Sequence, residues 1–238
     1  FLNSTPTASA TAQLNVLIHT NLTYWFLKDR IPQWTGIDAP ITGNIGVSGT
    51  CNAFYNGTSI NFYNAGGGCN NTAFSTVIAH EYGHHVVNRR GLTQGGFGEG
   101  YSDALAIMLY DTGIVGQDFT TSGGFVRNPE GAQQQFPCAS TAVHTCGQIV
   151  GGTWRWIRNN WVARDGVAAA LPPARQLFAS WTLITLGGQG SNALNSAHPQ
   201  TAIEVLTLDD NDGILSNGTP NYGVICPAFD RHNIDCPV

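Results

Sequence analysis

Charged residues are scarce in this chain, and their scarcity limits what it can bind. Only 11% of its 238 residues are Asp, Glu, Lys or Arg, and Lys28 is the single lysine. The formal net charge of −5 is mild. The sequence has no basic stripe of the kind that nucleic-acid-binding proteins use. We therefore expect no nucleic-acid partner.

Long apolar runs are absent as well. No stretch approaches the roughly 18 consecutive apolar residues of a membrane-spanning helix, so we expect no membrane partner. The chain begins at Phe1 without a methionine or a charged-then-apolar signal peptide. We interpret it as a mature form from which a signal and a propeptide have been removed. Its length allows one sizeable core, or two lobes around a cleft.

Six cysteines occur in this lysine-poor chain, which is rich in Gly and Asn. That usage suggests an oxidising compartment and hence a secreted, extracellular protein. Many pairings are possible, but the spacing favours three local disulfides. The predicted pairs are Cys51–Cys69, Cys138–Cys146 and Cys226–Cys236. The alternative is a cysteine-rich metal site, although the chain has no C-x-x-C pattern.

The most informative segment is His80-Glu81-Tyr82-Gly83-His84. On a helix, residues i and i+4 share a face, so the two histidines can point at one ion. A catalytic zinc accepts His nitrogens and carboxylate oxygens, keeps three protein ligands and leaves its fourth position to water. Glu81 lies about 100° round the helix from His80 and can reach that water as a general base. The alternative is a solvated surface helix, but the apolar residues before the motif predict a buried one.

The third zinc ligand is expected downstream of the motif. One zincin pattern continues as H-x-x-G-x-x-H, but Val87 and Arg90 occupy its Gly and His positions. His85 points about 100° away from His84 and is a poor ligand. Glu99 opens a second helical run, and Asp103 follows four residues later on the same face. We predict Glu99 as the third ligand and Asp103 as the acceptor that fixes the tautomer of a ligand histidine. The alternative for both is an ordinary acidic first turn that complements the helix dipole.

These motifs together resemble those of the gluzincin metallopeptidases. The chain is similar to the thermolysin-like group, and Gly98-Glu99-Gly100-Tyr101-Ser102-Asp103 is closest to its fungalysin-type branch. Three weaker matches occur in the family's order along the chain, over roughly residues 14 to 165. They are the edge strand Asn52-Ala53-Phe54-Tyr55-Asn56-Gly57, the arginine element Val126-Arg127 and the histidine segment Val143-His144.

The resemblance implies an α+β, two-lobed zincin fold with the zinc helix in the cleft, as one catalytic domain over residues 1–238. Residues 1–90 would form an N-terminal lobe with a small β-sheet, and residues 91–238 a mainly helical C-terminal lobe. It implies a secreted zinc endopeptidase that acts on protein or peptide substrates. It also implies a zymogen with an inhibitory propeptide.

The resemblance further implies roles for two residues outside the zinc ligands. His144 would stabilise the oxyanion of the transition state, and Arg127 would bind the carbonyl next to the scissile bond. The alternatives are a loop histidine beside a disulfide and a surface salt bridge, respectively. The chain departs from the family in one respect, because no tyrosine lies between His84 and Gly98 to serve as a second oxyanion donor.

Substrate contacts are also implied by the resemblance. Asn52 and the backbone of Ala53 would hold the substrate as an added strand. Val77 and Val126 would help to line the pocket for the first residue of the leaving group. That pocket should prefer a bulky apolar side chain.

Two other functions stay open. A zinc aminopeptidase would need a group that binds a free substrate amine, and no Gly-x-Met-x-Asn segment is present. An extracellular binding module with structural zinc would need a site closed by four ligands. The free glutamate of the motif and the three-ligand set argue against that module.

A second metal is suggested near the C-terminus. The run Asp209-Asp210-Asn211-Asp212-Gly213 is rich in the oxygen ligands that calcium prefers. Leu208 stands where an EF-hand would need an acid, so only an irregular Ca²⁺ loop is possible. The alternative is a solvated turn built by Asx side chains.

The remaining pattern predicts where the other elements lie. Residues 1–10 are expected to form an extended arm, residues 31–50 short strands, and residues 115–146 irregular structure that holds Arg127. Asn56-Gly57 is a strong hairpin signal within residues 52–63. The glycines of residues 91–98 are expected to separate the two metal helices as a hinge. Further helices are expected at 12–29, 147–163, 173–186 and 199–206.

Overall fold

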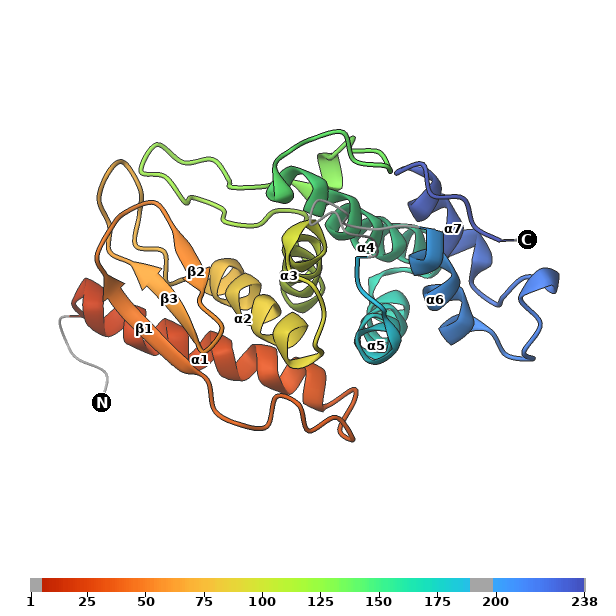
Figure 1. The fold of residues 1–238 in the computed structure, drawn as a ribbon, viewed down its shortest axis with the longest axis horizontal. Helices are drawn as coiled ribbons and strands as arrows, with labels where there is room; N and C mark the ends of the chain where they lie inside the picture. Colours follow the sequence, from red (N-terminus) through yellow and green to blue (C-terminus); the bar gives the residue numbers. More distant parts are fainter. Residues whose placement is uncertain (1–5, 189–198, 238) are drawn as a thin grey trace.

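The computed structural model of the chain describes residues 6–188 and 199–237. A small sheet lies at one end and helices fill the rest (Figure 1). The α-helices are α1 (Ala8–Lys28), α2 (Ser75–Arg89), α3 (Gly95–Tyr110), α4 (Val143–Asp165), α5 (Val167–Ile184), α6 (Pro199–Asp209) and α7 (Tyr222–Asp230). The strands are β1 (Thr42–Val47), β2 (Ala53–Tyr55) and β3 (Ser59–Tyr63), and two short 3-10 helices are η1 (Pro129–Gly131) and η2 (Leu215–Asn217). The predicted mixed α and β class is therefore confirmed.

The sheet has the order β1-β3-β2. β1 pairs with β3 in parallel, and β2 pairs with β3 antiparallel as the predicted hairpin. The turn is built by Asn56, whose Oδ1 accepts hydrogen bonds from the backbone of Thr58 and Ser59, and by Gly57, whose φ of +97° suits glycine. Because β2 pairs on one side only, it is an edge strand, which a peptide could extend.

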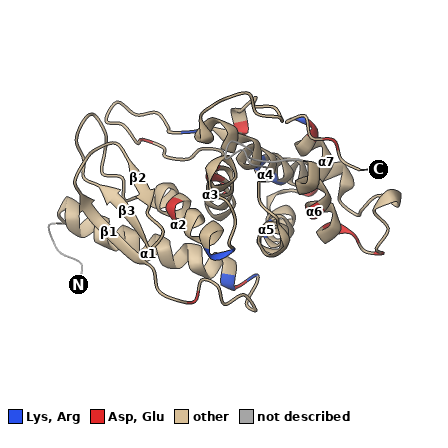
Figure 2. Ribbon diagram, viewed as in Figure 1, with Lys and Arg blue, Asp and Glu red and all other residues tan. Residues whose placement is uncertain are grey.

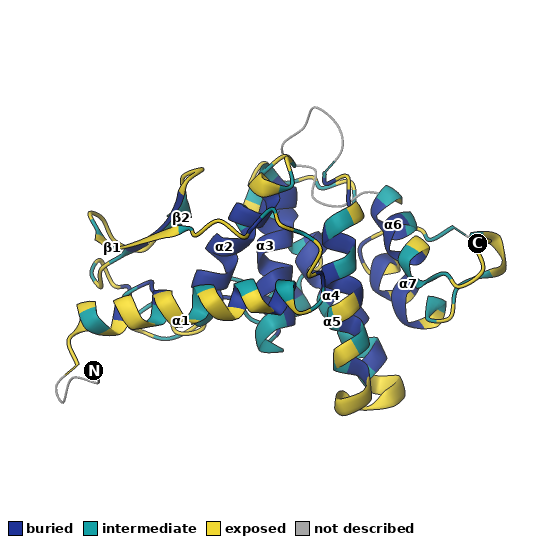
Figure 3. Cartoon of the chain, turned by 90° about the horizontal axis from the view of Figure 1, so that it is seen from below, coloured by how far each residue is buried: buried dark blue, intermediate teal, exposed yellow. Residues whose placement is uncertain are grey.

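The two largest apolar clusters of the described residues hold the molecule together. The smaller lies where α1 and α2 cover the sheet, around Val16, Phe62 and Ile78. The larger contains residues of every helix from α1 to α7, with Trp154 and Trp181 fully buried among them. The helix α2 is therefore buried on both sides, against the sheet and α1 on one and against α3 on the other. Figure 3 shows α2 and α3 as the most buried elements, whereas the outer face of α1 is exposed.

Several expected boundaries were wrong, for local reasons. α1 starts at residue 8 because Thr7 caps it, with its hydroxyl accepting from the backbone of Ala10. α5 was expected to begin at Pro173, but it begins at residue 167 and contains both Pro172 and Pro173. Buried Ala170 and Ala174 pack into the larger cluster and outweigh the cost of the prolines.

Two further differences concern the segments near the predicted site. α3 begins at residue 95, so three of the four glycines expected to form a hinge lie inside a helix. α4 begins at residue 143, within the segment expected to be irregular. α7 was not predicted, because its nine residues include Pro227 and follow no capping signal. Of the expected N-terminal arm, residues 1–5 lie outside the described part, and the division into two lobes stays a prediction.

Charge is sparse over the whole ribbon (Figure 2). Lys and Arg are scattered among several elements and form no continuous stripe in that view. Within the described residues, no helix is both long enough and apolar enough to cross a membrane.

Candidate metal centre

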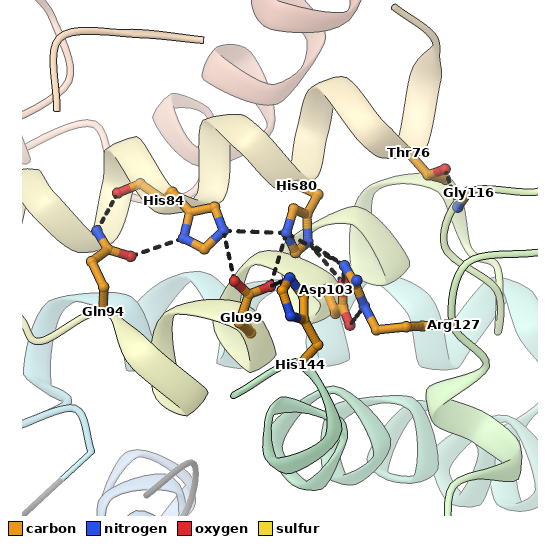
Figure 4. Close-up of polar contacts among 9 residues, drawn as sticks. All are labelled: Thr76, His80, His84, Gln94, Glu99, Asp103, Gly116, Arg127 and His144. Atoms are coloured by element: carbon orange, nitrogen blue, oxygen red, sulfur yellow. Dashed lines mark hydrogen bonds and ion pairs between the residues drawn. The ribbon is translucent and has the colours of Figure 1, made fainter. Parts of the chain in front are cut away.

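The helix α2 presents two imidazoles from one face. His80 and His84 are one turn apart, and their Nε2 atoms lie 3.2 Å from each other. Both side chains are largely removed from solvent, with exposed fractions of 7% and 14%. Their Nδ1 atoms point to other partners, so the two Nε2 atoms face one small volume (Figure 4).

The helix α3 adds a carboxylate to this volume. Glu99 Oε2 lies 3.3 Å from Nε2 of His80, and Oε1 lies 3.6 Å from Nε2 of His84. One ligand atom from each of the three residues falls within 4.8 Å of the others, and no other group of this kind is found in the described part of the chain. The structure thus brings together the three residues predicted as zinc ligands; their role stays a prediction.

Small residues allow the three helices of the site to approach closely. A Cβ on Gly83 would run into the backbone of Ser102, at the crossing of α2 and α3. A Cβ on Gly147 would run into the Cβ of Glu99 and the backbone of Gly100, at the crossing of α3 and α4. The glycines therefore set the distance at which Glu99 faces the imidazoles.

Asp103 and Arg127 lie behind His80. Asp103 is fully buried, and its Oδ1 lies 2.7 Å from Nδ1 of His80. Arg127 donates to both of its oxygens, from Nε to Oδ2 at 2.7 Å and from a terminal nitrogen to Oδ1 at 2.8 Å. Asp103 therefore occupies the predicted position beside a motif histidine. Arg127 forms a buried pair rather than a surface salt bridge, because its side chain is only 12% exposed.

These contacts shift the pKa values of the cluster in the absence of metal. Burial and Arg127 act to lower the pKa of His80, but Asp103 outweighs them and raises it to about 9. For Asp103, the charges of Arg127 and His80 overcome the effect of burial and hold its pKa well below the usual range. Burial also lowers the pKa of His84 to about 4. Burial alone would raise the pKa of Glu99, but its contact with His80 lowers it to about 2.

Glu81 lies beside the cluster without belonging to it. It is 5% exposed, and burial raises its pKa to about 7. Two cavities of about 430 Å³ each open onto it. Both are lined by Asn52, Ala53, His80, Glu81 and His144. The predicted general base is thus a buried carboxyl group at the floor of an accessible cleft.

His144 comes from the first turn of α4. Its Nε2 lies 3.4 Å from Oε2 of Glu99, and its side chain is 60% exposed. Two residues later, Cys146 forms a disulfide with Cys138. His144 is therefore a helix residue, not a loop residue, and it borders both cavities.

The predicted substrate residues lie around the same cavities. Ala53 is the first residue of the edge strand β2 and Asn52 directly precedes it, next to the Cys51–Cys69 disulfide. Val77 and Val126 line one cavity together. Four other residues of that wall were not predicted, namely Val115, Phe119, Thr145 and Gln148. No motif marks them, because the loops that hold Val115 and Phe119 meet α2 only in the folded chain.

Gln94 is a polar neighbour of the cluster that sequence analysis missed. Its Oε1 lies 2.8 Å from Nδ1 of His84, and its Nε2 donates to the backbone oxygen of the same residue at 2.9 Å. A glutamine in a glycine-rich link carries no motif. The one sequence feature that accompanies this contact is Gly98, four residues after Gln94. In the structure, a Cβ at Gly98 would run into the amide of Gln94.

No second oxyanion donor is evident at the expected place. Arg90 donates to the backbone oxygens of Thr182 and Leu183, at the end of α5. Tyr55 lines one cavity, but its hydroxyl donates to the backbone oxygen of Gly57. His85 is buried, and its ring packs edge-to-face against Tyr55. It does not belong to the group of His80, His84 and Glu99.

The acidic loop near the C-terminus is organised by its own hydrogen bonds. Asp209 accepts from Thr219 and Asn221. Asp212 accepts from the backbone of Ile214 and the side chain of Asn217. This is the arrangement of an Asx-rich turn, and calcium binding there stays a prediction. The third predicted disulfide, Cys226–Cys236, closes this end of the chain, so all three predicted pairs are present.

Comparison with known proteins supports the fold. No protein-family model matches the sequence, and no curated protein matches it. Among solved structures, the chain is similar to the precursor of protealysin, a metalloproteinase from Serratia proteamaculans, with a TM-score of 0.67. The match covers 98% of this chain and 81% of that chain at 12% sequence identity. The fold of the chain is therefore similar to that of a metalloproteinase precursor, and its placement in the fungalysin-type branch stays a prediction.

Proposed function

We propose that this protein is a zinc-dependent endopeptidase that hydrolyses peptide bonds with Glu81 as the general base. The observation that carries the proposal is the convergence of His80, His84 and Glu99 beside a separate buried carboxyl group. The likeness to a metalloproteinase precursor supports a protease, and the cleft beside an edge strand suits an extended peptide.

The residues present fit a zinc ion. Glu99 Oε2 is buried and makes no hydrogen bond of good geometry, although His80 and His144 lie 3.3 and 3.4 Å from it, and a bound cation would satisfy it. Two imidazoles and one carboxylate are a donor set typical of catalytic zinc, which leaves one position open. Zinc bound there would supply a Lewis acid that polarises a carbonyl group and acidifies water.

Glu81 would move the proton. Its carboxylate would accept a proton from the attacking water and deliver it to the nitrogen of the departing amine. A general base works best when its pKa lies near the working pH, and burial raises the pKa of Glu81 to about 7.

Other residues would bind the substrate. Asn52 and the backbone of Ala53 would pair with the peptide as an added strand. His144, exposed at the mouth of the cleft, would donate a hydrogen bond to the developing oxyanion. Arg127 would bind the next carbonyl with a terminal nitrogen while its pair with Asp103 holds it in place.

Specificity would come from the cavity that contains Val77 and Val126. Its wall includes Val115 and Phe119, so it should accept an apolar side chain on the leaving-group side of the bond. One methylene more or less changes discrimination by only about 1–3 kcal/mol. We therefore infer that the substrate residue on the leaving-group side is apolar, without naming one amino acid.

The three disulfides suit an oxidising compartment, and we infer that the protein is secreted. The likeness to a precursor is consistent with an inhibitory propeptide. The substrates would be proteins or peptides outside the cell.

The test of this function is Glu81→Gln, with Glu130→Gln as the matched control because Glu130 lines neither cavity. Zinc content and cleavage of a denatured protein would be measured for both. We expect Glu81→Gln to keep one zinc and to lose cleavage, and Glu130→Gln to keep both. Mapped internal cleavage sites would exclude an aminopeptidase. Cleavage by Glu81→Gln at the unmodified rate would reject the mechanism.

A further inference from the structure

We propose that Gln94 is a positioning residue that fixes the tautomer of His84, so that its Nε2 carries the free lone pair that binds metal. The inference rests on the proposed metal centre. It adds a residue that no motif of the sequence marks.

The orientation of the Gln94 amide follows from its two contacts. The backbone oxygen of His84 can only accept a hydrogen bond, so the NH₂ end of Gln94 must face it, at 2.9 Å. The amide oxygen must then face Nδ1 of His84, at 2.8 Å. Because that oxygen can only accept, Nδ1 must carry the proton. Nε2, the atom 3.6 Å from Glu99 Oε1, is left as the unprotonated nitrogen.

Gln94 also ties the two metal helices together. It is the residue before α3, and its backbone oxygen accepts from the backbone of Gly98 at 3.1 Å. Its side chain reaches back to α2 at His84 (Figure 4). Gln94 thus links the start of α3, the helix that carries Glu99, to the imidazole of His84, which Glu99 faces.

Gly98 supplies the space that the amide needs. A Cβ at this position would lie against Oε1 of Gln94, well inside van der Waals contact. Gly98 has no left-handed backbone conformation that would itself require glycine, and in a helix interior glycine is about 1 kcal/mol less favourable than alanine. Room for the Gln94 side chain is therefore a physical reason for glycine here.

The two motif histidines are thus held by unlike partners. His80 faces a buried carboxylate, Asp103, which is itself paired with Arg127. His84 faces a neutral amide that brings no charge into the site. Partners of this kind change metal affinity about 10- to 100-fold when they are removed.

The first experiment measures the zinc dissociation constant by competition with a chelator. Gln94→Leu should weaken binding about 10- to 100-fold, and Gln94→Glu, which keeps an acceptor for Nδ1–H but loses the donor to the backbone oxygen of His84, should recover part of that loss. The matched control is Gln13→Leu, at an exposed position of α1 outside both cavities, which should bind as the unmodified protein does. A folded Gln94→Leu protein with unchanged zinc affinity would overturn the proposal.

Gly98→Ala provides a second route that leaves Gln94 in place. Its added Cβ should displace the amide and weaken zinc binding, although alanine favours the helix. In a Gln94→Ala background the same change has nothing to displace and should have no further effect on affinity. Full additivity of the two changes would contradict the proposed contact.

The second experiment needs neither zinc nor activity. Nitrogen-15 NMR of the metal-free protein distinguishes the two imidazole tautomers, and we expect His84 to be protonated at Nδ1. The preference should disappear in Gln94→Leu and persist in Gln13→Leu. Protonation at Nε2 in the unmodified protein would reject the role of Gln94 and leave the protease proposal standing. Absence of zinc binding by the unmodified protein would instead reject the metal centre while this NMR result still stood.

Discussion

Asp103 joins the candidate metal centre to the most buried ion pair of the site, because one carboxylate contacts both Nδ1 of His80 and Nε of Arg127 at 2.7 Å. The carboxylate is fully buried. Its pKa is held well below the usual range by Arg127 and His80, against the opposing effect of burial. Two predictions depend on this contact, one for stability and one for metal binding.

Asp103→Asn should destabilise the metal-free protein. The change leaves Arg127 buried without a carboxylate, and removing one partner of a buried pair costs about 3–5 kcal/mol. Denaturant unfolding of the metal-free protein measures it. The matched control is Asp165→Asn, because the pair of Asp165 with Arg164 is on the surface and such pairs contribute little. Equal stabilities of the two variants would show that the buried pair does not hold the site.

Gly147→Ala should damage the site from α4. The added Cβ would run into Cβ of Glu99 and the backbone of Gly100, and overpacking of this kind costs about 1–3 kcal/mol. Because Glu99 is the residue displaced, zinc affinity should fall as well. Denaturant unfolding measures the loss of stability, and competition with a chelator measures the loss of zinc affinity.

The control for that change is Gly223→Ala in α7, where a Cβ would meet nothing within 4 Å. Alanine is the better helix former, so this variant should be as stable as the unmodified protein or more so. Loss of stability in both variants would show that the loss does not arise from crowding at the crossing of α3 and α4.

The sequence predicted the parts of the site that depend on local spacing. His80 and His84 are one helical turn apart, and so are Glu99 and Asp103, so each pair is placed by helix geometry alone. Hairpin pairing of β2 with β3 also followed from a local signal, Asn56-Gly57.

Contacts between segments distant in sequence could not be predicted in this way. The contact of Gln94 with His84 and the closure of a cavity by Phe119 depend on how loops pack against α2. The early start of α4 was missed because Ala142 provides no side-chain cap. The start of α5 was predicted too late, because its two prolines are typical of a helix start. In the structure the helix begins six residues before Pro173, where burial of its alanines outweighs the cost of the prolines. The helical position of His144 therefore emerged only from the structure.

Zinc binding should release a proton from His80. In the metal-free protein, Asp103 outweighs burial and Arg127 and raises the pKa of His80 from 6.5 to about 9, so the imidazole is protonated between these values. Metal needs the neutral form, so about one proton should leave His80 per zinc at about pH 8 and progressively fewer as the pH rises above the raised pKa. Calorimetric titration in buffers of different ionisation enthalpy counts the protons.

The Asp103→Asn variant tests the origin of that proton. Without the carboxylate, burial and Arg127 dominate and both favour neutral His80. Proton release at about pH 8 should then largely disappear. Release that is unchanged in the variant would assign the proton to another group.

Glu81→Gln should stabilise the metal-free protein at neutral and alkaline pH. Burial raises the pKa of Glu81 from 4.5 to about 7, so between these values the folded protein holds a proton that the unfolded chain has released. The free energy of unfolding therefore falls as the pH rises from 4.5 to about 7, because the folded protein must bury a charged Glu81 carboxylate. Above about pH 7 the full cost of burying that charge remains. Glutamine carries no such penalty, and the gain should be on the order of 3 kcal/mol above about pH 7.

The same gain should vanish below the ordinary pKa of glutamic acid, where both side chains are neutral in both states. Urea unfolding of the two metal-free proteins across this pH range measures the difference. A difference that does not change with pH would mean that Glu81 titrates normally and is solvated in the cleft. A gain confined to high pH would show that the proposed base is held in place at the expense of stability, as expected of a residue kept for catalysis.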